Sequence, residues 1–124
     1  MINKDSSNSL MIKGFINSVR DICHNNSVKA GWWGGERNKA ELICLMHSEL
    51  SEAMEGVRKD LMDDHLPHRK MEEVELADCM IRILDYCGAY DLDIGGALID
   101  KVEYNKHRED HKPSERNKPN GKKF

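Results

Sequence analysis

Residues 74–87, VELADCMIRILDYC, limit most strongly what this chain can fold into. Placed on a helix at about 100° per residue, the four charged side chains of this segment fall on one narrow stripe. They are Glu75, Asp78, Arg82 and Asp85. Apolar side chains and cysteine cover nearly all the remaining surface, which predicts a helix buried inside a protein. Because carboxylates are rarely buried unless they are paired or bound to metal, we expect the stripe to face a cation.

A second pair of carboxylates lies upstream, in the segment HSELSEAMEGVRK. Glu49 and Glu52 are three residues apart, as are Glu75 and Asp78, and this spacing puts both members of each pair on one face of a helix. If the two helices pack antiparallel, the four carboxylates face and repel one another. Mg²⁺ or Mn²⁺, hard ions that prefer oxygen ligands, would relieve that repulsion.

The composition indicates a single small helical domain. The chain has 124 residues, of which 33% are charged and 6% aromatic, and its net charge of -3 does not favour a nucleic-acid polymer as partner. No long apolar run and no signal peptide are present, so we expect no membrane partner. The cysteines lack a C-x-x-C spacing, which favours buried thiols of a reduced cytoplasmic protein over disulfides or zinc ligands: Cys23, Cys44, Cys79 and Cys87.

Apolar periodicity predicts four helices in an all-α domain that spans residues 1–110. The first is expected at about residues 9–25 and the second at 39–59, capped by Asn38 with Glu41 three residues on. Pro67 is expected to begin the third helix and Gly88 to end it. The fourth is expected at about residues 94–109. Residues 111–124 have no apolar period and a net positive charge, which predicts a flexible basic tail.

Two further groups of residues are candidate ligand contacts. Trp32 and Trp33 lie in the glycine-rich segment GWWGGERN, where each ring either plugs the end of a helical core or stacks on a flat ligand such as a nucleobase. Lys101, Asn105 and Arg108 share one face of the fourth predicted helix. That face is either a solvated surface or a row of donors for phosphate oxygens.

Taken together, these motifs resemble the signature of the all-α nucleoside triphosphate pyrophosphohydrolases. The local sequence is most similar to that of small MazG-like proteins over about residues 22–110, in four segments: GWW, HSELSEAMEG, VELADCMIRILD and KVEYNKHRED. The resemblance implies a four-helix MazG-like bundle that hydrolyses a nucleoside triphosphate, (d)NTP, to the monophosphate and pyrophosphate. It also implies an active site completed across subunits, in a homodimer or a dimer-of-dimers tetramer. The surplus apolar surface of the third helix suits burial against a second copy.

The resemblance also implies a role for each candidate residue. The four carboxylates, Glu49, Glu52, Glu75 and Asp78, would hold Mg²⁺, for which Mn²⁺ could substitute. Either Glu49 or Glu52 would orient or deprotonate the attacking water. The phosphates would be held by Lys101, Asn105 and Arg108, and the base would contact Trp32 or Trp33.

Three other interpretations remain. The chain could be a non-enzymatic helical oligomerisation or binding module in which Arg82, Arg58 or Lys59 pairs with the acidic stripe. Within the enzyme class, it could be a dUTPase or a phosphoribosyl-ATP pyrophosphohydrolase. A carboxylate-bridged di-iron bundle is disfavoured, because the Glu-x-x-His motif of that class is absent.

Overall fold

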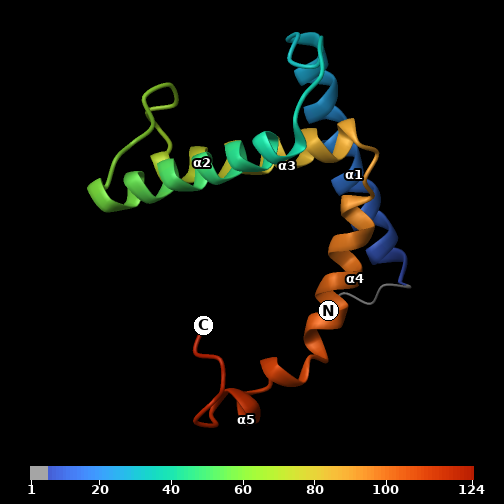
Figure 1. Ribbon diagram of the computed structural model, residues 1–124, viewed down its shortest axis with the longest axis vertical. Coiled ribbons are helices and arrows are strands. Elements are labelled where there is room, and N and C mark those ends of the chain that lie inside the picture. The colour runs from blue at the N-terminus through green and yellow to red at the C-terminus, as the bar shows by residue number, and fades with distance from the viewer. Residues whose placement is uncertain (1–5) are drawn as a thin grey trace. The chain divides into compact units, whose positions relative to one another are not determined.

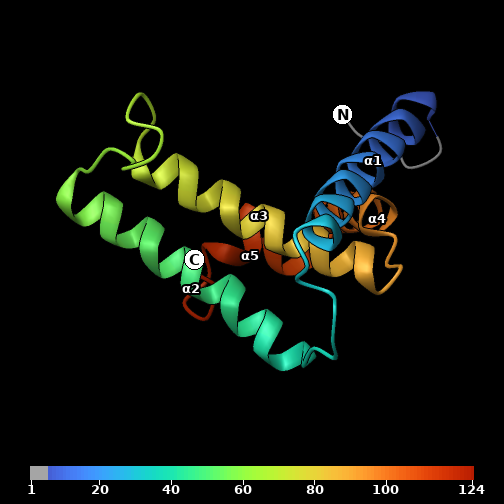
Figure 2. The same ribbon diagram turned by 90° about the horizontal axis from the view of Figure 1, so that it is seen from above.

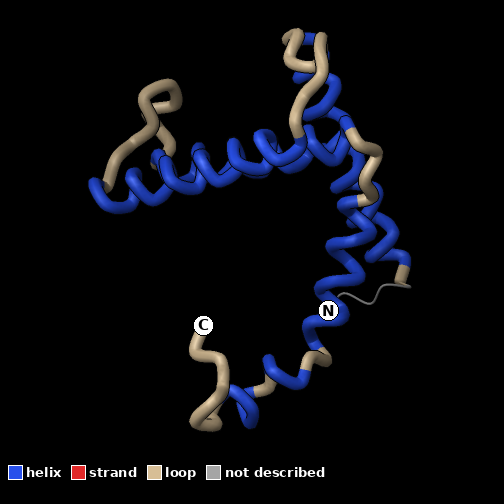
Figure 3. Tube along the Cα trace, in the orientation of Figure 1, coloured by secondary structure: helices blue, strands red, loops and turns tan. Residues whose placement is uncertain are grey.

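The structure, a computed structural model, describes residues 6–124, and this part of the chain is helical with no strand. The all-α fold predicted from the apolar periodicity is therefore confirmed, as the trace in Figure 3 shows. The helices are α1 (Ser7–Lys29), α2 (Lys39–Lys59), α3 (Met71–Ala89), α4 (Ile94–Lys106), the 3-10 helix η1 (Glu109–His111) and α5 (Pro113–Arg116). None of them combines the length and the apolar character that crossing a membrane requires.

The chain divides into two compact units. The hairpin unit, Ser18–Leu92, holds the second half of α1 together with α2 and α3. The terminal unit joins the first half of α1, up to Asn17, to the segment from Asp93 onward, with α4, η1 and α5. All four predicted carboxylates and both tryptophans belong to the hairpin unit.

In the hairpin unit α2 and α3 lie side by side and run antiparallel, as Figure 1 and Figure 2 both show. The predicted cap of α2 is present, since Asn38 Oδ1 accepts a hydrogen bond of 3.1 Å from the backbone N–H of Glu41. At the other end Asp60 adopts a left-handed conformation with φ 49°, which terminates the helix. The antiparallel packing of these two helices is what brings their acidic faces together.

The predicted start of α3 at Pro67 is wrong, because the helix begins at Met71. The buried carboxylate of Asp63 explains the difference. Its Oδ2 accepts hydrogen bonds of 3.0 and 2.8 Å from the backbone N–H groups of His65 and Leu66. This closes residues 63–66 into a turn, and the side-chain bonds compete with helix formation there.

Two glycines allow the helices of this unit to approach one another closely. A Cβ added at Gly56 would lie 2.9 Å from Cβ of Met71, at the end where α2 meets α3. A Cβ at Gly88 would lie 2.5 Å from Cβ of His24, between α3 and α1. Gly88 was expected to end α3, but the helix continues to Ala89 and is capped by Tyr90. Its role is thus close packing rather than termination.

The buried apolar side chains of the hairpin unit come from α2 and α3: Leu42, Ala53, Cys79, Leu84 and Cys87. The expectation that the third helix is buried on all sides is not met within one chain, since Met80 is 61% exposed and Leu76 and Ile81 are also exposed. All four cysteines are free thiols. Cys44 is exposed, which corrects its prediction as a buried thiol.

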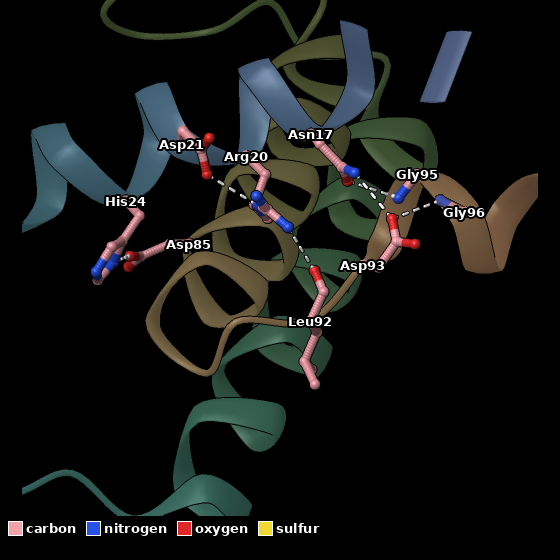
Figure 4. Close-up of polar contacts among 9 residues, drawn as sticks. All are labelled: Asn17, Arg20, Asp21, His24, Asp85, Leu92, Asp93, Gly95 and Gly96. Atoms are coloured by element: carbon pink, nitrogen blue, oxygen red, sulfur yellow. Dashed lines mark hydrogen bonds and ion pairs between the residues drawn. The ribbon is translucent and has the colours of Figure 1, made fainter. Parts of the chain in front are cut away.

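In the terminal unit a small polar network joins α1 to the start of α4. The side chain of Asp93 caps α4 by accepting from the backbone N–H of Gly96 at 2.9 Å. Asn17 donates to Asp93 at 2.8 Å and accepts from the backbone N–H of Gly95 at 2.9 Å, as Figure 4 shows. A Cβ at Gly95 would lie 2.5 Å from the carbonyl oxygen of Lys13, so α1 and α4 approach closely here.

The segment after α4 contains more local structure than its composition suggests. The fourth helix ends at Lys106 rather than at about residue 109. Two short helical turns follow: η1 ends where the predicted tail begins, and α5 lies within residues 111–124, where a flexible tail was expected. Ion pairs such as Lys122 Nζ to Asp110 Oδ2, at 2.8 Å, connect residues within this segment.

Candidate functional site

The candidate site begins with a cluster of carboxylates between α2 and α3. One carboxylate oxygen each from Glu49, Glu52 and Glu75 lies within 4.8 Å of the others. Glu75 is 9% exposed and Glu49 is largely buried, whereas Glu52 is exposed. Asp78 follows one turn after Glu75, and the negative charges of Glu49 and Glu52 act on its carboxyl group. The helix spacing seen in the sequence therefore brings three of the four predicted carboxylates together, and Asp78 lies outside the group whose oxygens converge.

The electrostatics of the cluster are those of a site that needs positive charge. Burial, a hydrogen bond with Glu49 and the charges of the neighbouring carboxylates raise the pKa of Glu75 from 4.5 to about 7. Burial and then the charge of Glu49 also raise the pKa of Asp78, an effect that the guanidinium of Arg82 partly opposes. Near neutral pH the cluster therefore holds a proton at a position where a cation would be more favourable.

The oxygen donors fit a divalent ion of the Mg²⁺ or Mn²⁺ type. Every donor is a carboxylate, the ligand class that these ions prefer. Mg²⁺ binds oxygen at about 2.1 Å, so two donors of one octahedral shell lie at most about 4.2 Å apart. The span of 4.8 Å between the three glutamates is close to that limit, and a small inward movement of one side chain would close it.

Within residues 6–124 a single cation pairs with the cluster. Arg82 Nε donates to Glu49 Oε1 at 2.8 Å. Among residues 6–124 no ion pair reaches Glu52, Glu75 or Asp78 within 4.0 Å, so one guanidinium faces four carboxylates. The cluster as a whole remains under-neutralised.

An open cleft of about 640 Å³ adjoins the cluster, entirely within the hairpin unit. Glu49, Asp78 and Arg82 line its acidic part. Side chains from the end of α1 and from the following loop line the rest, among them Asn26, Ser27, Trp32 and Arg37. Its volume is within the range of about 300–1,000 Å³ that is usual for small-molecule sites. A ligand in this cleft would meet carboxylates, guanidinium groups and an aromatic ring.

The two tryptophans have different surroundings. Trp33 Nε1 donates to Asp85 Oδ1 at 2.9 Å and to Ser27 Oγ at 3.1 Å. Its ring packs edge-on against His24 and Tyr90, with centroid distances of 5.5 and 5.9 Å. By contrast, Trp32 is 67% exposed and lines the cleft. Trp33 is thus the packed ring, and Trp32 is the ring open to a ligand.

Two contributors to the site were given no role by the sequence, and a third, Asp85, was placed there only on the acidic stripe. His24 Nδ1 lies 2.9 Å from Asp85 Oδ1, as Figure 4 shows. Trp33 donates to the same oxygen. The guanidinium carbon of Arg37 lies 4.8 Å from the centre of the Trp33 ring, a cation–π contact at the cleft. Asp85 stands on the predicted acidic stripe, which was the available signal. No sequence pattern marked His24 or Arg37.

The three residues predicted to bind phosphate, Lys101, Asn105 and Arg108, belong to the terminal unit. Lys101 Nζ lies 4.6 Å from the centre of the Tyr104 ring. Arg108 makes two hydrogen bonds to the carboxylate of Asp110, at 3.0 and 2.7 Å, so its guanidinium is already engaged. Asn105 Oδ1 is buried and has no hydrogen-bond partner in the described part of the chain. The site assembled above contains residues of the hairpin unit alone.

No protein-family model, no curated protein and no solved structure matches this chain.

Proposed function

We propose that this chain is a divalent-metal-dependent nucleoside triphosphate pyrophosphohydrolase that converts (d)NTP to (d)NMP and pyrophosphate. The observation that carries the proposal is the convergence of three glutamate oxygens within 4.8 Å beside a cleft of nucleotide size. A triphosphate cannot approach four carboxylates unaided, because both are negatively charged. Bound Mg²⁺ or Mn²⁺ would supply the charge that lets the two meet and would polarise the α-phosphate.

The proposed chemistry divides among the residues of the hairpin unit. Glu49, Glu52, Glu75 and Asp78 hold the metal. Glu52, which is exposed and makes no ion pair among residues 6–124, is the better placed of the two candidate bases to take the proton of the attacking water. The new bond forms between the water oxygen and the α-phosphorus. The bond from the α-phosphorus to the bridging oxygen breaks, and pyrophosphate leaves.

The remaining residues position the substrate. Trp32 stacks on the base, while Trp33 supports the wall beside it. The family resemblance assigns the phosphates to Lys101, Asn105 and Arg108, and this remains part of the proposal. Arg108 would have to release Asp110 to take that role.

A homodimer or a dimer of dimers is part of the same proposal. Apolar side chains on α2 and α3 are exposed in the single chain and would be buried against a second copy: Leu50, Met54, Val57, Leu76, Met80 and Ile81. Light scattering coupled to size-exclusion chromatography should give at least twice the mass of one chain. A monomer at micromolar concentration would contradict this part of the proposal.

Product analysis tests the reaction. With Mg²⁺ and a panel of common NTPs and dNTPs, we expect pyrophosphate and a monophosphate, and no turnover in EDTA. In water enriched with heavy oxygen the label should appear in the monophosphate, because attack is at the α-phosphorus. Orthophosphate and a diphosphate from every active substrate would contradict the proposal. The same panel separates a dUTPase from an enzyme of broader specificity, and phosphoribosyl-ATP can be added to it.

One observation favours a second candidate, the non-enzymatic helical module. The ion pair of 2.8 Å between Arg82 and Glu49 is the contact that such a module requires. In that case Mg²⁺ would not change the stability of the protein, and no nucleotide would be hydrolysed. The uncompensated charge at Glu52, Glu75 and Asp78 favours the enzyme.

A further inference from the structure

Arg82 is in an unusual position for a residue that only stabilises the fold. It lies one turn after Asp78 on α3, lines the cleft and is 39% exposed, whereas its partner Glu49 is 13% exposed. Its single hydrogen bond to the described residues uses Nε. A guanidinium has five N–H donors, so most of the donors of Arg82 remain open to the cleft.

The hydrogen bond of Arg82 also occupies a metal ligand. Glu49 Oε1 accepts from Arg82, yet Glu49 is one of the three glutamates whose oxygens converge. A carboxylate that binds a divalent ion loses most of its attraction for a guanidinium, and the ion repels the guanidinium. Metal binding at the cluster therefore favours release of Arg82 from Glu49.

A released Arg82 has one suitable partner in the cleft. The planar fork of an arginine matches the oxygens of a phosphate and can bind two of them at once. We propose that Arg82 is an exchangeable phosphate ligand: it neutralises Glu49 in the free protein and moves to the phosphate chain when metal and nucleotide enter. This inference rests on the proposed function and adds a phosphate-binding residue within the hairpin unit.

The exchange predicts opposite effects on two affinities. Without Arg82, a metal ion alone should bind more tightly, because a competing positive charge has been removed from Glu49. A metal–polyphosphate complex should bind more weakly, because its guanidinium partner is missing. An ion pair that only stabilises the fold could also raise the affinity for metal when it is lost, but it would leave the affinity for polyphosphate unchanged.

The experiment compares the full-length wild-type chain with Arg82→Gln and with the matched control Arg69→Gln. Arg69 forms an exposed ion pair of 3.1 Å with Glu73 in the same unit, so the control loses the same charge and the same kind of contact away from the cleft. Electron paramagnetic resonance measures the binding of Mn²⁺ alone. Calorimetry measures the binding of inorganic tripolyphosphate at saturating Mg²⁺, which requires no knowledge of the base.

For Arg82→Gln we expect the dissociation constant for Mn²⁺ to fall by about threefold or more. The dissociation constant for tripolyphosphate should rise by roughly tenfold or more, as expected for a lost charge-assisted hydrogen bond. Arg69→Gln should resemble the wild type in both. If Arg82→Gln binds Mn²⁺ but its dissociation constant for tripolyphosphate lies within about twofold of that of the control, the exchange is contradicted while the proposed function stands. A wild-type chain that binds no Mn²⁺ would overturn the proposed function and the exchange together.

Arg82→Lys covers the case in which the glutamine variant fails to fold. Lysine keeps the charge and can still pair with Glu49, but it lacks the planar fork. Its far-ultraviolet circular dichroism should match that of the wild type. We expect its affinity for tripolyphosphate to fall by about threefold or more. An unchanged affinity in the lysine variant would overturn the assignment of a bidentate phosphate contact.

Discussion

Asp85 and Glu75 stand on the same stripe of α3, and their surroundings differ in every respect. The carboxylate of Asp85 lies within 2.9 Å of N–H donors on both Trp33 and His24. The carboxylate of Glu75 is more deeply buried and faces Glu49 and Glu52 instead. One end of the stripe is therefore a satisfied polar contact that organises the fold, and the other is unsatisfied in charge, a group of repelling carboxylates that a cation would neutralise. A charged stripe read from sequence does not separate these two roles.

The largest effect should come from the unsatisfied end. Glu52→Gln should lower kcat by about 10²–10⁴, because it removes the proposed base, and should reduce the rise in Tm that Mg²⁺ produces. The metal-free variant should be as stable as the wild type or slightly more stable, since one repelling charge is gone. Activity assays and thermal melts with and without Mg²⁺ measure both effects.

The matched control for this prediction is Glu55→Gln. Glu55 lies on the same helix and pairs with Lys59 at 2.6 Å, away from the converging oxygens. It should lose neither activity nor the response to metal. If Glu52→Gln is clearly destabilised and Mg²⁺ does not change the Tm of the wild type, both ends of the stripe serve only to stabilise the fold.

The two tryptophans test the satisfied end of the stripe, where Trp33 donates to Asp85. Trp33→Ala should cost roughly 3 kcal/mol of folding free energy, because a packed ring and its hydrogen bonds are lost. Trp32→Ala should change stability by less than about 0.5 kcal/mol and weaken nucleotide binding by roughly 1–3 kcal/mol. Urea unfolding and calorimetric titration with metal and a nonhydrolysable nucleotide separate the two outcomes. Equal loss of stability in both variants would show that Trp32 is also a packed ring.

Asp85→Asn tests whether Asp85 only organises the fold. Both donors share Oδ1, and a neutral amide oxygen accepts hydrogen bonds more weakly than a charged carboxylate, so we expect a loss of about 1–3 kcal/mol in the free energy of unfolding. The rise in Tm with Mg²⁺ should remain. Asp21→Asn, at an exposed carboxylate paired with neighbouring Arg20 at 2.9 Å, serves as the control. Loss of the metal response in Asp85→Asn alone would place Asp85 among the metal ligands.

The sequence was most informative where the structure depends on local spacing. Two features depend only on the helix in which they lie: the i, i+3 carboxylate pairs that begin at Glu49 and Glu75, and the cap at Asn38. They are therefore the same whatever the helices pack against. The existence of the four main helices followed from the apolar periodicity of the sequence. The candidate metal cluster was predictable because two such local patterns needed only an antiparallel pairing to meet.

The features that could not be predicted depend on contacts between distant residues. Which tryptophan is packed depends on Asp85, 52 residues further along the chain. The start of α3 depends on how the carboxylate of Asp63 folds its own loop, which competes with a plausible helix start at Pro67. The position of His24 depends on the absence of a side chain at Gly88. None of these pairings leaves a periodic signal.

The most gradual expected effect is a pH dependence of stability at the unsatisfied end. Burial, followed by the contacts with neighbouring carboxylates, raises the pKa of Glu75 in the metal-free folded protein from 4.5 to about 7. Between these values the folded state holds a proton that the unfolded chain has released. The contribution to stability is therefore complete below pH 4.5 and is lost as the pH rises to about 7. The slope for one proton is at most about 1.4 kcal/mol per pH unit.

Urea unfolding in EDTA, from pH 4.5 to 7.5, measures this slope in the wild type and in Glu75→Gln. Titrating groups outside the cluster are common to both proteins, so the difference between the two curves reports Glu75 together with its interactions with the neighbouring carboxylates. The wild type should lose stability relative to the variant as the pH rises, because its carboxyl must ionise beside Glu49 and Glu52. Saturating Mg²⁺ should remove the difference in slope, since the ion takes the place of the proton. Parallel curves in EDTA would mean that Glu75 is as well satisfied as Asp85, and the contrast between the two ends of the stripe would be lost.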